Sequence, residues 1–293
     1  FLRRKKLLTD SFSQLASQFV YTVSLPVLVF VQLAQAKLSD IFDLPLLVMG
    51  TVGTLAFFFI GWGVGYFMIP DRPSRGSFIQ GCFRTNYGII GMAFATTLLS
   101  GSPGLSKASL LLATITPLNN VLAVIALSIH GEHGKQLRVK EIVLEIIKNP
   151  MEIAAILGIA VSFSPIPCPT FFLKTCTELS NLAVPLALLA IGGTVKTKLA
   201  KKEKIYAWTA AIIKVFVQPL VLVSLAIWIG FRHEDLLLTF LLFCSPTAVI
   251  GYVMADAMAN NRHLSGSIIL LTIVSSVFSI SAGIFILRAT HLI

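Results

Sequence analysis

The stretch GCFRTNYGIIGM at residues 81–92 places polar residues and three glycines inside an apolar segment that is otherwise long enough to cross a bilayer. A second stretch, FCSPTAVIGY at residues 243–252, interrupts another apolar segment about 160 residues later. Ile250 and Gly251 of the second stretch take the places of Ile90 and Gly91 of the first. Two helices broken at corresponding places in two halves of a chain are typical of the substrate site of a secondary transporter.

The composition indicates a membrane protein that crosses the bilayer several times. Of 293 residues, 56% are hydrophobic and 12% are charged, which is too apolar for a soluble chain of this length. The net charge is +10, and the basic residues form short clusters between apolar stretches instead of one basic face. This distribution favours the lipid bilayer as a partner and argues against nucleic acid.

Nine apolar stretches have about the length that crosses the hydrocarbon core. They lie at residues 12–34, 44–69, 76–99, 104–129, 150–164, 171–195, 204–229, 236–258 and 265–290. The longest segment between them, residues 131–149, is expected to include a short interfacial helix over residues 139–147. The four cysteines lack metal-ligand spacing, so we expect free thiols or, alternatively, one bridge between Cys168 and Cys176.

An internal repeat relates the two halves of the sequence. LPVL at residues 25–28 resembles VPLA at 184–187, and the Leu-Ser pair at 105–106 recurs at 264–265, both at an offset of 159. The stretch at 150–164 has no counterpart in the first copy, so we expect one further helix before the first residue and ten helices in the complete protein. Five helices per copy turn the second copy upside down relative to the first, which predicts an inverted repeat.

The basic residues also predict which side of the membrane each loop occupies. Sixteen of the 23 fall on one side of this topology and five on the other, which assigns the first side to the cytoplasm. The protein is therefore predicted to lie in the cell (plasma) membrane, with loop 131–149 on the cytoplasmic side. Two basic residues, Arg84 and Lys214, remain inside the predicted spans.

Three motifs together resemble the auxin efflux carrier family, which includes bacterial carriers and, more distantly, the plant PIN auxin exporters. They are FRTNYGIIG at residues 83–91, PLNN at 117–120 and SPTA at 245–248. The resemblance covers essentially the whole chain. In the plant carriers the broken helices cross at prolines, and an asparagine with nearby polar groups holds the carboxylate of the substrate. Pro246 matches the second crossing, whereas the first copy has NYG at residues 86–88, without a proline.

The resemblance implies an all-α, ten-helix inverted repeat with two subdomains. The scaffold would comprise residues 1–40 and 150–200, and the transport domain residues 41–130 and 201–293, with the cytoplasmic loop at 131–149 between the copies. The likeness also makes a homodimer through the scaffold plausible.

The broken helices suit the binding of a small organic anion. The start of a second half-helix exposes backbone N–H groups at the positive end of the helix dipole. Asn86 and three hydroxyl residues can donate to a carboxylate, while Pro246 leaves the carbonyl four residues earlier without its usual donor. The candidate substrate-binding residues are Arg84, Thr85, Asn86, Tyr87, Gly88, Asn119, Asn120, Ser245, Pro246 and Thr247.

Arg84 is the sharpest single candidate, because a guanidinium inside the membrane is costly without a partner and can bind a carboxylate with two hydrogen bonds. The alternative is that Arg84 reaches toward the cytoplasmic surface or pairs with carbonyls at a helix end. Lys214 is expected either to supply positive potential or to pair with Asp256, with the pair favoured. Asn119 and Asn120 are expected either to bridge helices or to face the crossing.

The sequence favours transport over the other function classes. Its five histidines lie in loops or at the chain ends, without the spacing of a metal or catalytic site, so we expect no enzyme, cofactor or metal. The spans around the broken segments hold few acidic residues, which argues against a sodium site built from carboxylates. We expect a carrier that exports a small organic anion, auxin-like or a short carboxylate, by an elevator mechanism. The alternative is a membrane sensor that binds the same class of anion without transporting it.

Overall fold

The computed structural model describes residues 9–35, 43–99, 102, 104–131, 148, 150–164, 168–182, 185–186, 189 and 201–293. Apart from one antiparallel bridge, these residues form no strand, and the protein is an all-α membrane protein. The predicted interfacial helix at 139–147 and the basic cluster at 3–6 lie outside the described residues.

Contacts divide the chain into two compact units. Unit 1 comprises Phe1–Asp40 and Gln136–Thr197, and unit 2 comprises Ile41–Lys135 and Lys198–Ile293. Each unit therefore combines a segment from each half of the sequence. The roles of the two units as scaffold and transport domain stay a prediction.

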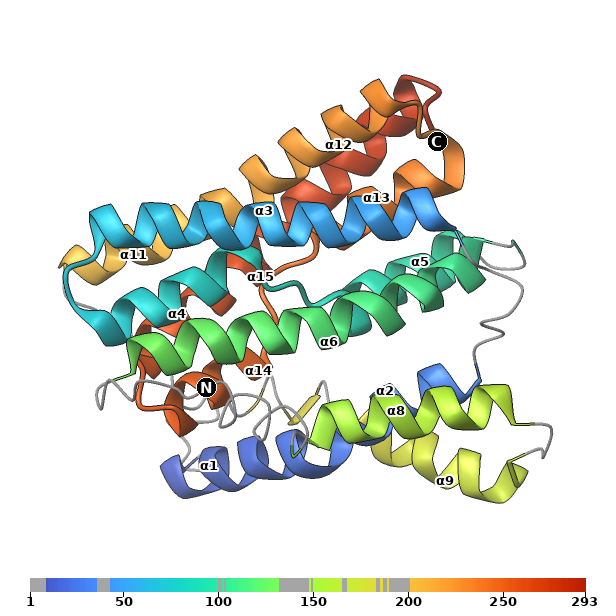
Figure 1. The fold of residues 1–293 in the computed structure, drawn as a ribbon, viewed down its shortest axis with the longest axis horizontal. Helices are drawn as coiled ribbons and strands as arrows, with labels where there is room; N and C mark the ends of the chain where they lie inside the picture. Colours follow the sequence, from blue (N-terminus) through green and yellow to red (C-terminus); the bar gives the residue numbers. More distant parts are fainter. Residues whose placement is uncertain are drawn as a thin grey trace. The chain divides into compact units, whose positions relative to one another are not determined.

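Unit 1 is a small group of helices in which α2 packs against α8 and α9 (Figure 1). Its elements are α1 (Asp10–Phe19), the π-helix η1 (Val20–Ser24), α2 (Leu25–Ala34), α8 (Pro150–Phe163) and α9 (Thr170–Asn181). The rings of Phe30 and Phe172 meet edge to face, with 6.1 Å between their centroids. This contact joins a helix of the first half of the sequence to a helix of the second.

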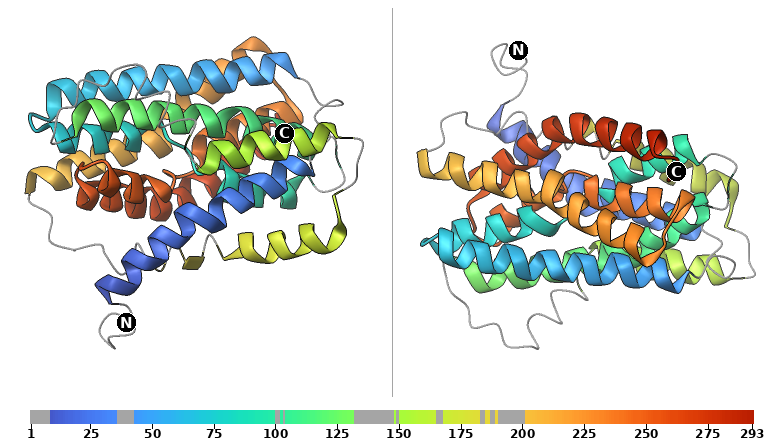
Figure 2. Two further views of the ribbon diagram at one scale, coloured as in Figure 1. Left: turned by 60° about the horizontal axis from the view of Figure 1, so that its bottom comes forward. Right: turned by 90° about the horizontal axis from the view of Figure 1, so that it is seen from above.

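Unit 2 repeats one order of elements: a long helix, a broken helix and another long helix. In the first half these are α3 (Leu44–Met68), the broken helix of α4 (Arg72–Phe83), η3 (Tyr87–Gly91) and α5 (Met92–Leu98), and α6 (Gly104–His130). In the second half they are α11 (Lys201–Ile212), η4 (Ile213–Val217) and α12 (Gln218–Ile229), then α13 (His233–Cys244) and α14 (Ile250–Ala257), then α15 (Arg262–Ala289). The elements η3 and η4 are π-helices. Figure 2 shows α3 and α6 side by side, as their contacts require.

Local sequence explains where the helices of unit 2 begin and end. Asp43 and Asp71 cap α3 and α4 by accepting hydrogen bonds from the N–H groups of Leu46 (3.2 Å) and Ser74 (3.0 Å). Gly230, with φ at 104°, ends α12 in the left-handed conformation that glycine adopts without strain. Within the described part of the chain, four helices are long and apolar enough to cross a membrane: Leu44–Met68, Leu110–His130, Lys202–Ile229 and Arg262–Ala289.

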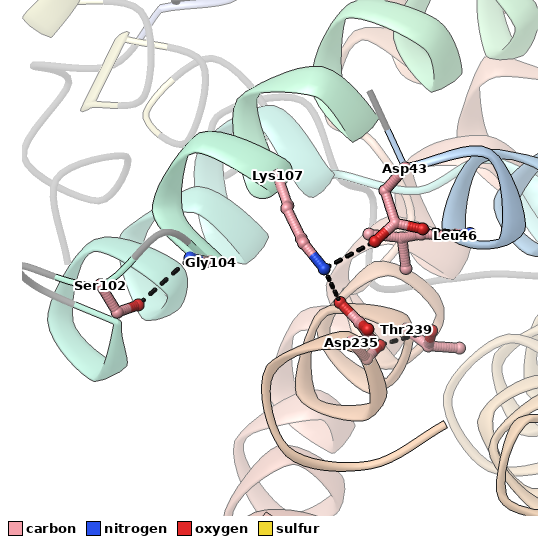
Figure 3. A network of polar contacts seen from close by, with 7 residues as sticks. All are labelled: Asp43, Leu46, Ser102, Gly104, Lys107, Asp235 and Thr239. Carbon is pink, nitrogen blue, oxygen red and sulfur yellow. Dashed lines mark hydrogen bonds and ion pairs between the residues drawn. The ribbon is translucent and has the colours of Figure 1, made fainter. Parts of the chain in front are cut away.

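Charged side chains make contacts at both ends of α6. At the start of α6, Lys107 Nζ lies 2.6 Å from Asp43 of α3 and 2.6 Å from Asp235 of α13, so one lysine ties together helices from both halves of the sequence (Figure 3). At the far end of α6, Arg72 donates to the carbonyl of Ile129. Charged side chains thus hold the two ends of unit 2, whereas Arg84 and Lys214 are buried between them.

Candidate substrate site at the crossing of two broken helices

Two extended segments cross where the broken helices are interrupted. Helix α4 ends at Phe83 and α13 ends at Cys244, and the segments that follow pass one another in the middle of unit 2 (Figure 1). Thr85 and Thr247 form an antiparallel bridge, and the N–H of Asn86 donates to the carbonyl of Pro246 at 2.8 Å. The crossing is therefore a direct backbone contact between the two halves of the sequence.

Two threonine hydroxyls satisfy the carbonyls that the breaks expose. Pro246 has no N–H, which leaves the carbonyl of Leu242 without its helical donor, and the hydroxyl of Thr85 donates to that carbonyl at 2.7 Å. In the other direction, the hydroxyl of Thr247 donates to the carbonyl of Gly81 at 2.8 Å. Each broken helix thus caps the other, which keeps buried carbonyls paired inside the membrane.

The bridge places Arg84 where the second copy has Pro246. An offset of 160 instead aligns Asn86 with Pro246, because two more residues separate Thr85 from Ile90 than separate Thr247 from Ile250. The extra residues are taken up by the π-helix η3, where the carbonyl of Asn86 accepts from the N–H groups of Ile90 (3.0 Å) and Gly91 (3.4 Å). The first copy therefore brings an arginine to the crossing.

Arg84 points into unit 2 and not toward the surface. Its side chain is 2% exposed, Nη1 donates to the sulfur of Met254 at 2.8 Å, and Nη2 donates to Oδ1 of Asn120 at 2.5 Å. The alternative in which Arg84 reaches the cytoplasmic surface is therefore wrong. Asn120, which was expected either to bridge helices or to face the crossing, accepts this bond from its place in α6 and so links α6 to the end of α4 at the crossing.

Three polar atoms of the candidate site residues are buried and find no hydrogen-bond partner among the described residues. They are Tyr87 Oη, Asn119 Oδ1 and Asn120 Nδ2. An unpaired buried polar group costs about 1–3 kcal/mol, so native structures rarely keep one without a ligand, water or function. Two of these atoms, Tyr87 Oη and Asn120 Nδ2, can donate, and a pair of free donors with a buried guanidinium suits an anion, whereas Asn119 Oδ1 can only accept.

The hydroxyls of Thr85, Ser245 and Thr247 have a different role from the one expected. Each donates to a backbone carbonyl, that of Ser245 to Leu241 at 2.6 Å, and a hydroxyl has only one hydrogen to give. In this arrangement they build the crossing, and their oxygens can only accept. Asn86 is 6% exposed and caps no helix with its side chain, so its amide joins the remaining donors.

Lys214 and Asp256 do not pair. Lys214 is fully buried, and Nζ donates to Oε1 of Gln218 at 2.7 Å and to the carbonyl of Phe243 at 3.3 Å. Asp256 is instead paired with Arg262 at 2.9 Å, with its side chain 39% exposed. The prediction of a Lys214–Asp256 pair is wrong because α14 carries Asp256 away from the crossing, whereas η4 holds Lys214 against the end of α13.

Sequence reasoning missed three residues that hold the site together. Gln80 donates to the carbonyl of Gly251 at 2.9 Å and to Ser265 at 3.3 Å, and Met254 and Gln218 contact Arg84 and Lys214. The two glutamines stand four residues from a buried basic residue, a spacing that brings side chains together on a helix and could have identified them. Met254 carries no such signal, since it looks like any apolar residue of a span.

Comparison with known proteins bears on the family to which the chain belongs. A family model described as membrane transport protein matches residues 1–142 and 135–284, two consecutive matches that together cover nearly the whole chain. A search of curated proteins found no significant match. The family is one of transporters and not of enzymes, and its match confirms the resemblance seen in the motifs. This multi-pass membrane protein belongs to the auxin efflux carrier family of membrane transport proteins.

Proposed function

We propose that this protein is a secondary transporter that exports a small organic anion, auxin-like or a short carboxylate, and that it binds this anion at the crossing in unit 2. The observation that carries the proposal is the buried guanidinium of Arg84, held by Asn120 and accompanied by the unpartnered donors of Tyr87 and Asn120.

The donors favour a carboxylate over a cation or a neutral solute. Arginine presents N–H groups in a planar fork that matches the two oxygens of a carboxylate, and hydrogen bonds to charged groups are about twice as strong as neutral ones. The half-helix that begins at Ile250 adds the positive end of its dipole. Buried acidic side chains, which would attract a cation, do not occur among the described residues.

Transport would follow from displacement of unit 2 against unit 1, with the two inverted copies providing two similar end states. In this scheme residues 41–130 and 201–293 carry the anion, and residues 1–40 and 150–200 form the scaffold and the homodimer contact. An inside-negative potential of 100 mV favours the exit of each negative charge by about 2.3 kcal/mol. Export therefore needs no coupling ion.

Solid-supported membrane currents from proteoliposomes of the full-length protein would test the proposal. Indole-3-acetate, malonate and malate would be applied in turn to the wild type, to Asn86→Ala and to the control Asn181→Ala, which changes an exposed asparagine of α9. We expect a current for at least one anion in the wild type and the control, and its loss in Asn86→Ala.

Equal thermal unfolding midpoints for the three proteins would show that a lost current does not reflect misfolding. A wild-type current in Asn86→Ala would place the site elsewhere. The absence of current for every anion, together with absence of binding by calorimetry, would contradict the proposed substrate class.

A further inference from the structure

Lys214 is a buried basic residue whose immediate partners are all uncharged. Its side chain is fully buried, and its two hydrogen-bond acceptors are the amide of Gln218 and the backbone carbonyl of Phe243. Within the described part of the chain, no carboxylate pairs with Lys214.

The hydrogen bond to Phe243 places the amine at the C-terminal end of α13. The last carbonyls of a helix have no helical donor and carry the negative end of its dipole, so they stabilise a nearby ammonium. A helix end supplies about half an elementary charge, which leaves the positive charge of the lysine only partly compensated. An ammonium compensated in this way attracts any anion that comes close to it in the same low-dielectric surroundings.

The same helix end is part of the crossing. Phe243 follows Leu242, whose carbonyl accepts the hydroxyl hydrogen of Thr85, and Thr85 follows Arg84. A short path of covalent and hydrogen bonds therefore joins Lys214 to the guanidinium of the proposed site. The first copy has no equivalent charge, because Thr54, at the offset of 160, donates its hydroxyl to the carbonyl of Gly50 in its own helix.

We propose that Lys214 is a long-range anion-recognition residue: the electric field of its ammonium at the crossing strengthens the binding of an anion there, and more so for an anion of higher charge. This inference rests on the proposed function, since it concerns an anion bound at the crossing. It assigns to Lys214 no contact with the anion. Arg84 supplies hydrogen bonds that depend on shape, whereas Lys214 supplies an attraction that depends on valence.

A matched pair of ligands separates this role from a structural one. Malonate carries two negative charges, and its mono-amide, malonamate, has nearly the same shape and one charge. Removal of a distant positive charge costs binding free energy in proportion to the valence of the anion, so the fold-change in affinity is squared for a doubly charged anion. If Lys214→Met weakens malonamate binding about tenfold, malonate binding falls about a hundredfold, within the range of typical coupling between sites.

Calorimetric titration of the full-length protein with both ligands at fixed ionic strength would test this. We expect the valence-dependent loss in Lys214→Met, affinities near the wild type in Lys214→Arg, and no valence dependence in Thr54→Val, the matched change in the first copy. Unfolding midpoints would be measured for every variant.

An equal loss of affinity for malonate and malonamate in Lys214→Met would overturn the inference and leave a structural role. The same holds if Lys214→Arg behaves like Lys214→Met, because the charge would then not matter. If the wild type binds neither ligand, the proposed function fails for short carboxylates, and this inference fails with it.

Discussion

The two halves of the crossing share one reciprocal pair of hydrogen bonds and differ in their chemistry. Thr85 and Thr247 occupy equivalent places, pair with one another and donate to the carbonyls of Leu242 and Gly81 at 2.7 and 2.8 Å. The residue before each threonine differs: Arg84 in the first half and Pro246 in the second. The proline lacks a donor, and the arginine brings several.

The helices next to the crossing also differ between the two halves, because only one of them carries a buried basic residue. In the first half α3 is a regular helix with Thr54 bonded to its own backbone, whereas the second half inserts the π-helix η4 and buries Lys214 there. π-Helical turns inside helices are frequent at functional sites. The comparison teaches that symmetry builds the crossing, while the departures from symmetry supply the positive charge on which anion binding would depend.

The largest expected effect comes from removing the arginine that breaks the symmetry. Arg84→Gln should weaken binding of a transported carboxylate by about a hundredfold or more, because truncating one partner of a buried charge pair costs about 2–5 kcal/mol. Arg84→Lys keeps the charge without the planar fork and should fall between Arg84→Gln and the wild type. Calorimetric titration would measure both. Affinity in Arg84→Gln equal to that of the wild type would remove Arg84 from the site.

A second test breaks each half of the symmetric contact in turn. Thr85→Val and Thr247→Val keep the shape of the side chain but leave a buried carbonyl unpaired, so each should lower the free energy of unfolding by about 1–3 kcal/mol. The two losses should be similar. Denaturant titration would measure them, with Thr97→Val as the control, since Thr97 is exposed and bonded within its own helix. A large difference between the two variants would mean that one half holds the crossing alone.

The paired glycines should differ in their tolerance of a methyl group, and the smallest effect is expected at Gly251. A Cβ at Gly91 would overlap the ring of Tyr87 and lie 3.1 Å from Ser245 Oγ, whereas a Cβ at Gly251 would lie 3.3 Å from the flexible end of Gln80. Gly91→Ala should lower the free energy of unfolding by about 1–3 kcal/mol. Gly251→Ala should change it by about 1 kcal/mol or less, since alanine favours a helix. Unfolding midpoints in the reverse order would contradict this packing.

Much of the fold and part of the candidate site could be predicted from the sequence. The apolar stretches, the glycines and Pro246 predicted the broken helices, and the rarity of a basic residue inside a span singled out Arg84. These signals are local, because hydropathy and proline act on the segment that contains them. The contact of Lys214 with Phe243 could not be predicted in this way, since the two are 29 residues apart and only packing brings them together.

The sequence by itself determined that this chain is a repeated, helical membrane protein with two interrupted helices, since hydropathy and periodicity can be read from the residues in order. Only the tertiary structure decided that Asn86 pairs with Pro246 across the crossing, that threonine hydroxyls close it, and that Lys214 caps α13. These outcomes depend on a π-helix that absorbs two residues and on hydrogen bonds between segments as many as 166 residues apart. Such contacts form only when the helices pack, because each buried donor must then find an acceptor.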